Sequence, residues 1–351
     1  MTREAELSGV RISRVGLGSW AMGGAGWLAS LGAQQDRDSR ATIAAAIEAG
    51  VNWIDTAPYY GLGHAEEVIG DCLAALPDQD RPMVFTKCGI VWESAHEPPA
   101  EVLSPDSIRK ECETSLRRLR VERLDLLQVH WPATDGTAIE DSWAALADLV
   151  DEGKVRWIGV SNFDNSLLDR CERIRHVDTL QPPFSLLRRD AAAELIPWCH
   201  RHATAVLVYS PLESGLLADA YTPKRVADLA PTDVRLERTS VFCEPAFTRN
   251  LSFVERLRAL AAELGFTVPE LASAWVLSWP GVTAAILGAR TPAQLAAWSR
   301  SGSLRLDVET LASIAEALEA TGAGSGPLLP PLEPTESERS MTCNHESSED
   351  R

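Results

Sequence analysis

Three ionisable residues stand where short apolar runs of this sequence end. VNWI ends at Asp55, MVFT ends at Lys87, and LDLLQV ends at His130. A charge at the end of a buried strand is costly unless it is paired, and the opposite charges of Asp55 and Lys87 can neutralise each other. Tyr60 follows Asp55 by five residues in the segment DTAPYYGLG. A carboxylate, an ammonium, an imidazole and a phenol together suit proton transfer to or from a reacting oxygen.

Each of these residues also has an ordinary structural explanation. Asp55 could start a turn, Lys87 could be a solvated strand end, and His130 could be a hydrogen-bonded core histidine. The combination favours function, because three ionisable groups end successive apolar runs. The chain has only four tyrosines, and two of them, Tyr59 and Tyr60, lie in the turn after Asp55.

The elements that would position these residues alternate along the chain. The predicted strands are Val15–Gly18, Asn52–Asp55, Met83–Lys87, Leu124–His130, Val155–Ser161, Thr179–Gln181, Ala205–Ser210 and Ala284–Leu287. The predicted helices between them include Ser39–Ala49, Ala65–Leu76, Pro105–Leu119, Ile139–Glu152, Ser166–Ile174, Ala191–His202 and Pro269–Leu277. Eight strand–helix alternations favour a single-domain α/β fold, a closed (β/α)₈ TIM barrel. The segment LSGVRIS predicts an N-terminal β-hairpin that caps the bottom of the barrel.

Two segments interrupt the alternation. Residues 211–249 are rich in Pro, Gly and Asp and predict a long loop that is functional or mobile. Residues 323–351 have the composition of a disordered acidic tail, and residues 327–351 carry six acids against two arginines. The predicted barrel domain is therefore 1–322.

Composition and charge narrow the function. The 351-residue chain carries a formal net charge of −17, so neither nucleic acid nor an anionic membrane is an expected partner. Seven cysteines without a CxxC pair indicate reduced thiols and a cytoplasmic location, and no cluster predicts a metal site. The N-terminus lacks the apolar core of a secretory signal, and no apolar run is long enough to predict a membrane span.

Over roughly residues 7–320, the sequence resembles the aldo-keto reductase superfamily. The motifs that carry the resemblance are GLGSW (16–20), DTAPYYGLGHAEEVIG (55–70), FTKCG (85–89), LDLLQVHWP (124–132), IGVSNF (158–163), YSPLESGLL (209–217) and ILGAR (286–290). The catalytic tetrad that the resemblance implies is Asp55, Tyr60, Lys87 and His130. It selects Tyr60, which directly precedes a glycine, and leaves Tyr59 as a packing or pocket-wall residue.

The resemblance implies a hydride transfer between nicotinamide and a carbonyl or alcohol. Negative charge builds on the carbonyl oxygen when hydride reaches its carbon, and Tyr60 would donate the proton. Lys87 would stabilise the phenolate, and Asp55 would hold Lys87 in place and keep it charged. His130 could orient the carbonyl or share the proton donation. In the oxidation direction Tyr60 would act as the base.

A hydride must come from a cofactor, because no side chain supplies one. GLGSWAMGG lacks the Rossmann spacing, which favours binding at the barrel mouth. By resemblance, Ser161, Asn162 and Gln181 hold the nicotinamide carboxamide and Tyr209 stacks on the ring. The other implied cofactor contacts are Trp20, Asp55, Ser210, Leu212, Gly215, Leu216, Gly288, Ala289, Arg290 and Gln294.

The planar guanidinium of Arg290 suits a 2′-phosphate, so the expected cofactor is NADP, with NADPH preferred over NADH. Ser161–Asn162 could instead be a plain helix cap, Tyr209 core packing, and Arg290 a solvated surface residue. Many members of the family carry an acid–asparagine pair after the residues that match Gln294–Leu295. This chain has Ala297 and Trp298 there, and Trp298 could stack on adenine or pack the helix.

The substrate is a small carbonyl compound that the sequence does not define further, and the oligomeric state is open. Four tryptophans near predicted strand ends, Trp20, Trp27, Trp92 and Trp131, suggest an apolar or sugar-stacking wall. The alternatives are a dehydrogenase working in reverse, a cofactor-binding regulatory subunit with slow turnover, and a sugar-phosphate isomerase or aldolase. The IGVSNF motif and the complete tetrad favour the reductase.

Overall fold

The computed structural model describes residues 4–218, 220–230, 233–238 and 240–331. Within them, eight parallel strands close into a barrel in the order β10, β11, β12, β3, β4, β5, β8, β9. Their bounds are β3 (Val15–Gly18), β4 (Trp53–Asp55), β5 (Met83–Cys88), β8 (Leu124–Val129), β9 (Val155–Ser161), β10 (Thr179–Gln181), β11 (Ala205–Val208) and β12 (Val282–Gly288). The predicted (β/α)₈ barrel is confirmed, and all eight predicted strands belong to it.

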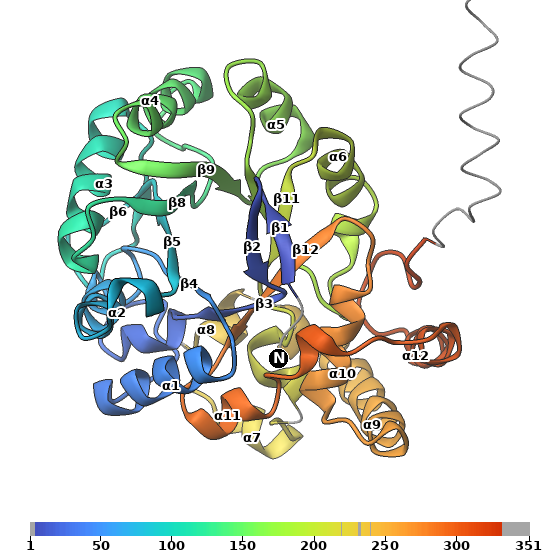
Figure 1. Cartoon of the computed structure of the whole chain (residues 1–351). Helices are drawn as coiled ribbons and strands as arrows, with labels where there is room; N and C mark the ends of the chain where they lie inside the picture. Colours follow the sequence, from blue (N-terminus) through green and yellow to red (C-terminus); the bar gives the residue numbers. More distant parts are fainter. Residues whose placement is uncertain (1–3, 219, 231–232, 239, 332–351) are drawn as a thin grey trace, which may run out of the picture.

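Helices surround the barrel in the alternating order that the sequence predicts (Figure 1). They are α1 (Asp36–Glu48), α2 (His64–Ala74), α3 (Pro105–Leu119), α4 (Ile139–Asp151), α5 (Asn165–Glu172), α6 (Leu195–His202), α9 (Ala246–Leu264), α10 (Val268–Leu277), α11 (Pro292–Ala296) and α12 (Val308–Thr321). Several begin at a side-chain cap. Thr267 and Glu270, for example, form a reciprocal capping box at the start of α10.

The N-terminal hairpin caps the bottom of the barrel, as predicted. Strands β1 (Glu4–Leu7) and β2 (Val10–Ser13) pair antiparallel and lie across the barrel centre in Figure 1. Leu7 and Ile12 are fully buried against the interior side chains, among them Trp53 and Phe85. The Trp53 ring fits because residue 16 is glycine, where a Cβ atom would lie 2.3 Å from that ring.

The segment 211–249 is not the long loop that its composition predicts. It contains the short helices η4 (Glu213–Ala218), α7 (Pro223–Ala227), α8 (Val234–Arg238) and η5 (Ser240–Phe242), and α9 begins at Ala246. The prolines and polar residues begin helices here: Thr222 caps α7, and Pro223 is its first residue. Composition alone therefore does not distinguish a loop from a chain of short helices.

The predicted boundary after residue 322 is also too early. Ala323 is buried, and Ser325 forms a bridge to Arg188 and accepts a hydrogen bond from the Arg189 backbone at 2.9 Å. Residues 323–331 are therefore part of the described barrel domain. The rest of the predicted tail, 332–351, lies outside the described residues.

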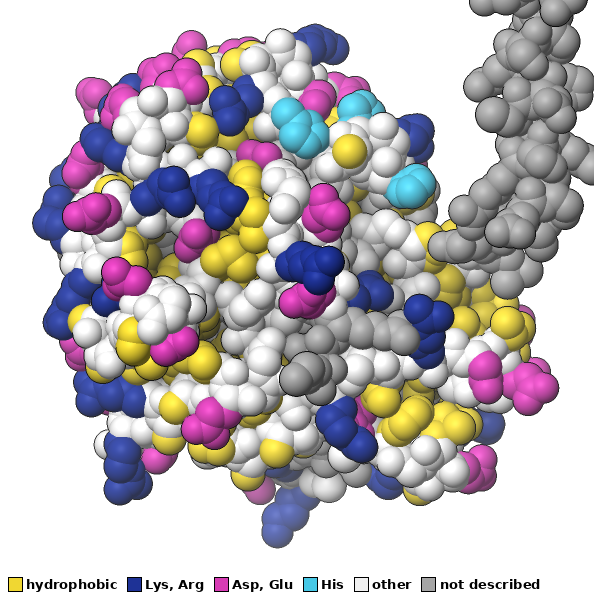
Figure 2. All heavy atoms as spheres, viewed as in Figure 1, with side chains coloured by type: hydrophobic (Ala, Val, Ile, Leu, Met, Phe, Trp, Pro, Cys, Tyr) yellow, Lys and Arg dark blue, Asp and Glu magenta, His cyan; other side chains and the backbone are white. Residues whose placement is uncertain are grey.

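Acidic and basic side chains are interspersed on the face that carries the hairpin (Figure 2). In the described part of the chain, no single helix is long and apolar enough to cross a membrane. Helices α9 and α10 reach the necessary length and composition only as a pair, with a 92° bend between them.

Candidate active site

Asp55 and Lys87 form a buried ion pair at the carboxyl ends of neighbouring strands. The Lys87 Nζ donates to Asp55 Oδ1 at 2.7 Å and to the Thr56 carbonyl at 2.9 Å. The side chains are 1% and 4% exposed. Burial lowers the pKa of Lys87 below its usual value, and the Asp55 carboxylate opposes this shift. The predicted neutralisation of the two charges is confirmed.

Gln181, on the opposite side of the barrel, is a second hydrogen-bond donor to Asp55. Its Nε2 donates to Asp55 Oδ2 at 2.8 Å. Both carboxylate oxygens of Asp55 therefore accept a hydrogen bond, one from an ammonium and one from an amide. These two hydrogen bonds fix the orientation of the Asp55 carboxylate.

Tyr60 lies over this pair with His130 beside it. The Lys87 Nζ is 5.4 Å from the centre of the Tyr60 ring, and the rings of Tyr60 and His130 meet edge to face at 5.9 Å. The turn that carries Tyr60 packs its backbone directly on the chain before α1. A Cβ atom at Gly61, whose φ is +63°, would lie 2.3 Å from the Gly23 carbonyl oxygen. The structure thus brings the four predicted tetrad residues together.

Tyr59 points into an aromatic cluster instead. Its ring contacts Trp27 edge to face at 5.1 Å and Trp92 at 6.0 Å. Val234 of α8 is buried in the same cluster, and Trp20 packs against it. The prediction that Tyr59 is a packing residue is confirmed, and this cluster forms an apolar wall beside Tyr60. Trp131, in contrast, is 38% exposed.

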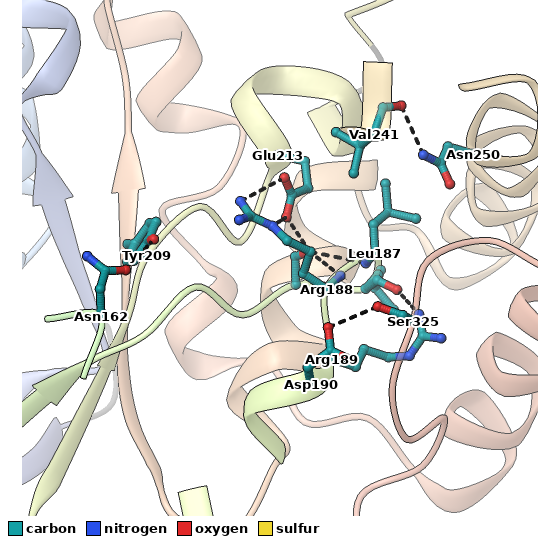
Figure 3. Close-up of polar contacts among 12 residues, drawn as sticks. Asn162, Leu187, Arg188, Arg189, Asp190, Tyr209, Glu213, Val241, Asn250 and Ser325 are labelled. Carbon is teal, nitrogen blue, oxygen red and sulfur yellow. Dashed lines mark hydrogen bonds and ion pairs between the residues drawn. The ribbon is translucent and has the colours of Figure 1, made fainter. Parts of the chain in front are cut away.

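The predicted nicotinamide residues form one hydrogen-bonded group. Ser161 Oγ donates to the Gln181 carbonyl at 2.8 Å, and Asn162 Nδ2 donates to Ser161 Oγ and to the His130 carbonyl. The Tyr209 hydroxyl donates to Asn162 Oδ1 at 2.8 Å (Figure 3). Asn162 has a left-handed backbone, with φ of 61°. The cap of α5 is Asp164, whose side chain accepts from the Leu167 N–H, so Ser161 and Asn162 are not a plain helix cap.

After Tyr209 the chain forms a turn with unusual backbone angles. Ser210, Glu213 and Ser214 have φ of 56°, 44° and 52°, and Gly215 has φ of 99°. Leu216 is buried, and Leu212 packs at the edge of the core. The predicted cofactor residues of this segment therefore lie in η4 and in the turn before it.

At the end of β12, Gly288 is exposed, and a Cβ atom there would meet nothing closer than the Gly18 carbonyl oxygen at 4.0 Å. Ala289 is buried, and Gln294 Oε1 accepts from the Arg290 backbone. Trp298 packs the helix: it is 2% exposed, and its Nε1 donates to the Gly288 carbonyl at 3.3 Å.

Arg290 contacts the segment before α1. Its Nε donates to Gln34 Oε1 at 3.0 Å, and its two terminal nitrogens donate to the carbonyls of Leu31 and Ala33. Gln34 Nε2 donates back to the Arg290 carbonyl at 2.9 Å. Among the residues that the structure describes, three of the five N–H groups of the guanidinium have acceptors, which leaves two for a ligand. Sequence reasoning missed Gln34, because no local pattern signals a partner 256 positions away.

Two further acids with raised pKa values, the buried Glu66 and the half-buried Glu111, were not predicted. Glu66 accepts from Thr86 Oγ1 at 2.8 Å and from Arg118 at 3.2 Å, and burial raises its pKa above the ordinary value. Glu111 accepts from the Gly89 backbone at 2.9 Å, just after Lys87, and burial raises its pKa to about 7. The signal for Glu66 was present within the DTAPYYGLGHAEEVIG motif.

An open cleft of about 880 Å³ lies elsewhere on the molecule, lined by residues such as Ser8, Arg14, Thr204 and Trp279. No member of the tetrad lines it. We therefore assign the active site by its chemistry, at the mouth, and not by cleft size.

The chain is similar to known proteins over almost its whole length. The model of the aldo/keto reductase family matches residues 14–319. Aldo-keto reductase YhdN of Bacillus subtilis is 34% identical over 319 residues, covering 90% of this chain and 92% of that protein. An NADH-specific methylglyoxal reductase of Escherichia coli is 35% identical over 324 residues, covering 88% of this chain and 97% of that protein.

The fold is also similar to that of solved structures. A glycerol dehydrogenase from Gluconobacter oxydans superposes with a TM-score of 0.83 at 34% identity, covering 95% of this chain and 98% of that one. An aldo/keto reductase from Klebsiella pneumoniae, solved with NADP and acetate, superposes with a TM-score of 0.69 at 26% identity over the same shares. The chain belongs to the aldo/keto reductase family. It is an NAD(P)-dependent oxidoreductase, as the sequence predicted.

Proposed function

We propose that this enzyme reduces a small aldehyde or ketone with NADPH, and that Tyr60 is the proton donor. The observation that supports this most directly is the Lys87 ammonium, buried against Asp55 and 5.4 Å from the Tyr60 ring centre. A fixed positive charge at that position stabilises the negative charge that develops when the phenol gives up its proton.

The residues of the mouth fit a bound nicotinamide. A carboxamide carries one carbonyl and one amino group, and the hydroxyl of Ser161 and the amides of Asn162 and Gln181 can match both. The bound cofactor supplies the hydride. Tyr60 then protonates the substrate oxygen, His130 orients that oxygen, and Asp55 keeps Lys87 charged. The aromatic wall of Trp20, Trp27 and Trp92 excludes water beside the carbonyl.

The preference for NADPH rests on Arg290. Gln34 and two backbone carbonyls hold its guanidinium, and within the described part of the chain two of its N–H groups remain for a 2′-phosphate. The relatives differ: one solved neighbour holds NADP, and one relative is named as NADH-specific. An Arg290→Ala variant should weaken binding of NADPH and leave binding of NADH nearly unchanged. Equal weakening of both would contradict the assignment.

The family acts on small carbonyl compounds, and the two relatives named for an activity act on methylglyoxal and glycerol. Their names support a small substrate with vicinal oxygen atoms, reduced or oxidised according to conditions. Asp55, Tyr60, Lys87 and His130 lie close together, and this favours turnover over a purely regulatory role. A cytoplasmic location is supported by the six cysteines of the described residues, all of which are free thiols.

The test is nucleotide binding and turnover in a Tyr60→Phe variant. Quenching of tryptophan fluorescence by NADPH and NADH gives the dissociation constants. Tyr60→Phe should keep the affinity for NADPH and lose aldehyde-dependent NADPH oxidation by about a hundredfold or more. Tyr59→Phe serves as the control, since Tyr59 packs in the aromatic cluster and should keep its turnover. Full turnover in Tyr60→Phe would overturn the role of this tyrosine.

A further inference from the structure

Glu213 is a buried carboxylate that the proposed reaction does not use. Its side chain is 1% exposed. Its Oε1 accepts from Ser185 Oγ at 2.6 Å and from Arg188 Nε at 3.0 Å, and its Oε2 accepts from a terminal nitrogen of Arg188 at 3.2 Å (Figure 3). A buried acid with three donors is fixed in place, and its charge is matched by one guanidinium.

The backbone beside Glu213 needs such an anchor. Glu213, Ser214 and Gly215 follow one another in the left-handed region, with φ of 44°, 52° and 99°. Residues other than glycine rarely adopt this conformation, and they keep it where surrounding contacts impose it. The Glu213 side chain supplies those contacts from within the turn.

The backbone of Arg188 is also fixed, by hydrogen bonds within its own turn. Ser185 Oγ accepts from the backbone N–H groups of Leu187 and Arg188, at 3.1 and 3.0 Å, which closes the turn that carries the guanidinium. Ser325 bridges to Arg188, and its hydroxyl donates to Asp190 at 2.9 Å. In Figure 3 this turn lies between η4 and the segment that carries Ser325.

The negative charge of Glu213 bears on cofactor binding, because its neighbours in the chain are predicted cofactor contacts. The same segment carries Ser210, Leu212 and Gly215, which the resemblance to the aldo-keto reductases implies lie along the cofactor pyrophosphate. A pyrophosphate is an anion, and an uncompensated carboxylate in the loop that binds it would repel it across a poorly screened site. The Arg188 side chain remains 31% exposed, so its positive charge is open towards solvent as well as towards Glu213.

We propose that Arg188 and Glu213 are positioning residues for the dinucleotide. The pair fixes the turn of residues 210–217 and cancels a negative charge that would otherwise oppose pyrophosphate binding. This inference rests on the proposed function, because it takes that turn as the pyrophosphate-binding segment. Since NADPH and NADH share the pyrophosphate, the pair should affect both cofactors equally, unlike Arg290.

The experiment compares Arg188→Ala, Glu213→Gln and the double variant by fluorescence titration with NADPH and with NADH. Arg188→Ala should raise both dissociation constants by a similar factor, on the order of tenfold, because it leaves the Glu213 carboxylate buried and unpaired. Adding Glu213→Gln should restore most of the affinity, since the glutamine carbonyl still accepts from Ser185 and carries no charge. The KM for cofactor should change more than kcat.

Glu140 and Arg170 provide the matched control. They form a similar two-pronged pair between α4 and α5, at 2.7 and 2.6 Å, and their exchange for Gln and Ala should leave cofactor affinity unchanged. If Arg188→Ala does not fold, Glu213→Gln alone still decides: it leaves the positive charge of Arg188 unopposed and should bind both cofactors more tightly than wild type, and unchanged or weaker binding would overturn the inference.

Unchanged affinity in Arg188→Ala would overturn the inference. So would a loss that Glu213→Gln does not restore, because that pattern belongs to a purely structural pair. Wild-type protein that binds neither nucleotide would overturn the proposed function itself, and the inference with it. Wild-type protein that binds NADPH, together with an indifferent Arg188→Ala, would overturn the inference alone.

Discussion

Lys87 carries a positive charge in a place where water cannot solvate it. Its side chain is 1% exposed, and its hydrogen bonds to Asp55 and the Thr56 carbonyl replace that solvation. The hydrogen bonds that offset the cost of burying the Lys87 ammonium also hold it beneath Tyr60. The same contacts therefore contribute both to stability and to the proposed catalysis.

A Lys87→Met variant should therefore be both less stable and less active than wild type. The methionine fills the space but leaves Asp55 buried with Gln181 as its remaining side-chain donor, so the free energy of unfolding should fall by about 3–5 kcal/mol. Turnover should fall at least as far as in Tyr60→Phe. Urea denaturation and NADPH oxidation measure both. Arg11→Met, at an exposed pair with Glu4, is the control and should change neither. A Lys87→Met protein of wild-type stability would contradict the prediction.

Glu111 makes stability depend on pH. Burial raises its pKa from 4.5 to about 7, so the folded protein holds this proton more tightly than the unfolded chain does. The stabilisation is complete below pH 4.5 and is lost as pH rises towards 7. A Glu111→Gln variant lacks this loss, so its free energy of unfolding should gain on wild type across that window, by at most about 3 kcal/mol.

The measurement is urea unfolding of both proteins at several pH values between 5 and 8. Exchange of the exposed Glu122 for Gln should leave the pH dependence of wild type intact. Parallel curves for wild type and Glu111→Gln would show that Glu111 does not cause the decline.

At this scale the sequence singled out the four residues of the proposed tetrad, and it missed the side chains that hold Arg290 and Arg188. Asp55, Lys87 and His130 could be found because each ends an apolar run, and Tyr60 because it follows a motif. Gln34 and Glu213 could not, since their roles depend on Arg290 and Arg188, which only the closed barrel brings near. A partner that is distant in sequence leaves no local pattern.

The strand ends are the elements that assemble the site, and β12 ends at an exposed glycine. Because a Cβ atom at Gly288 would come no closer to another segment than 4.0 Å, at the Gly18 carbonyl oxygen, Gly288→Ala should leave the free energy of unfolding nearly unchanged. It should still weaken cofactor binding several-fold, because the added methyl group occupies the space through which a ligand approaches the backbone. Thermal unfolding and fluorescence titration separate the two effects.

Gly18→Ala is the contrasting variant. Its Cβ atom would lie 2.9 Å from the Ile286 side chain, so it should lower stability. If Gly288→Ala binds NADPH as tightly as wild type, no cofactor lies against this strand end.

The regular elements were easier to predict than the segment between β11 and α10. In a parallel barrel the strands are short apolar runs and the helices are longer amphipathic segments, so the two can be told apart in the sequence. Each predicted strand was found in the structure. Helix α9 was not predicted because it follows a stretch whose prolines, such as Pro223 and Pro245, indicate turns. Val234 shows what that stretch does: it packs into the aromatic cluster beside Tyr59, a contact that depends on the fold and not on composition.

For the whole molecule, residues 323–331 close the structure around Arg189. The guanidinium is buried and donates to the carbonyls of Leu186, Ala323 and Gly326. A chain ending at Gly322 loses two of these acceptors, so its free energy of unfolding should be lower by about 3 kcal/mol than that of a chain ending at Pro331. Thermal or urea unfolding of the two truncated chains isolates the contribution of these nine residues. Equal stabilities would show that Arg189 is satisfied without them.

The hydrogen bond from Gln181 to Asp55 joins strands that are four places apart in a ring of eight, so it spans the full diameter of the barrel. An incomplete barrel cannot make this bond, and a half-assembled chain would hold Asp55 without its amide donor. We therefore expect the protein to gain activity late in folding, when the two halves of the ring meet. During refolding from urea, the rate of NADPH oxidation should recover more slowly than the helical circular dichroism signal.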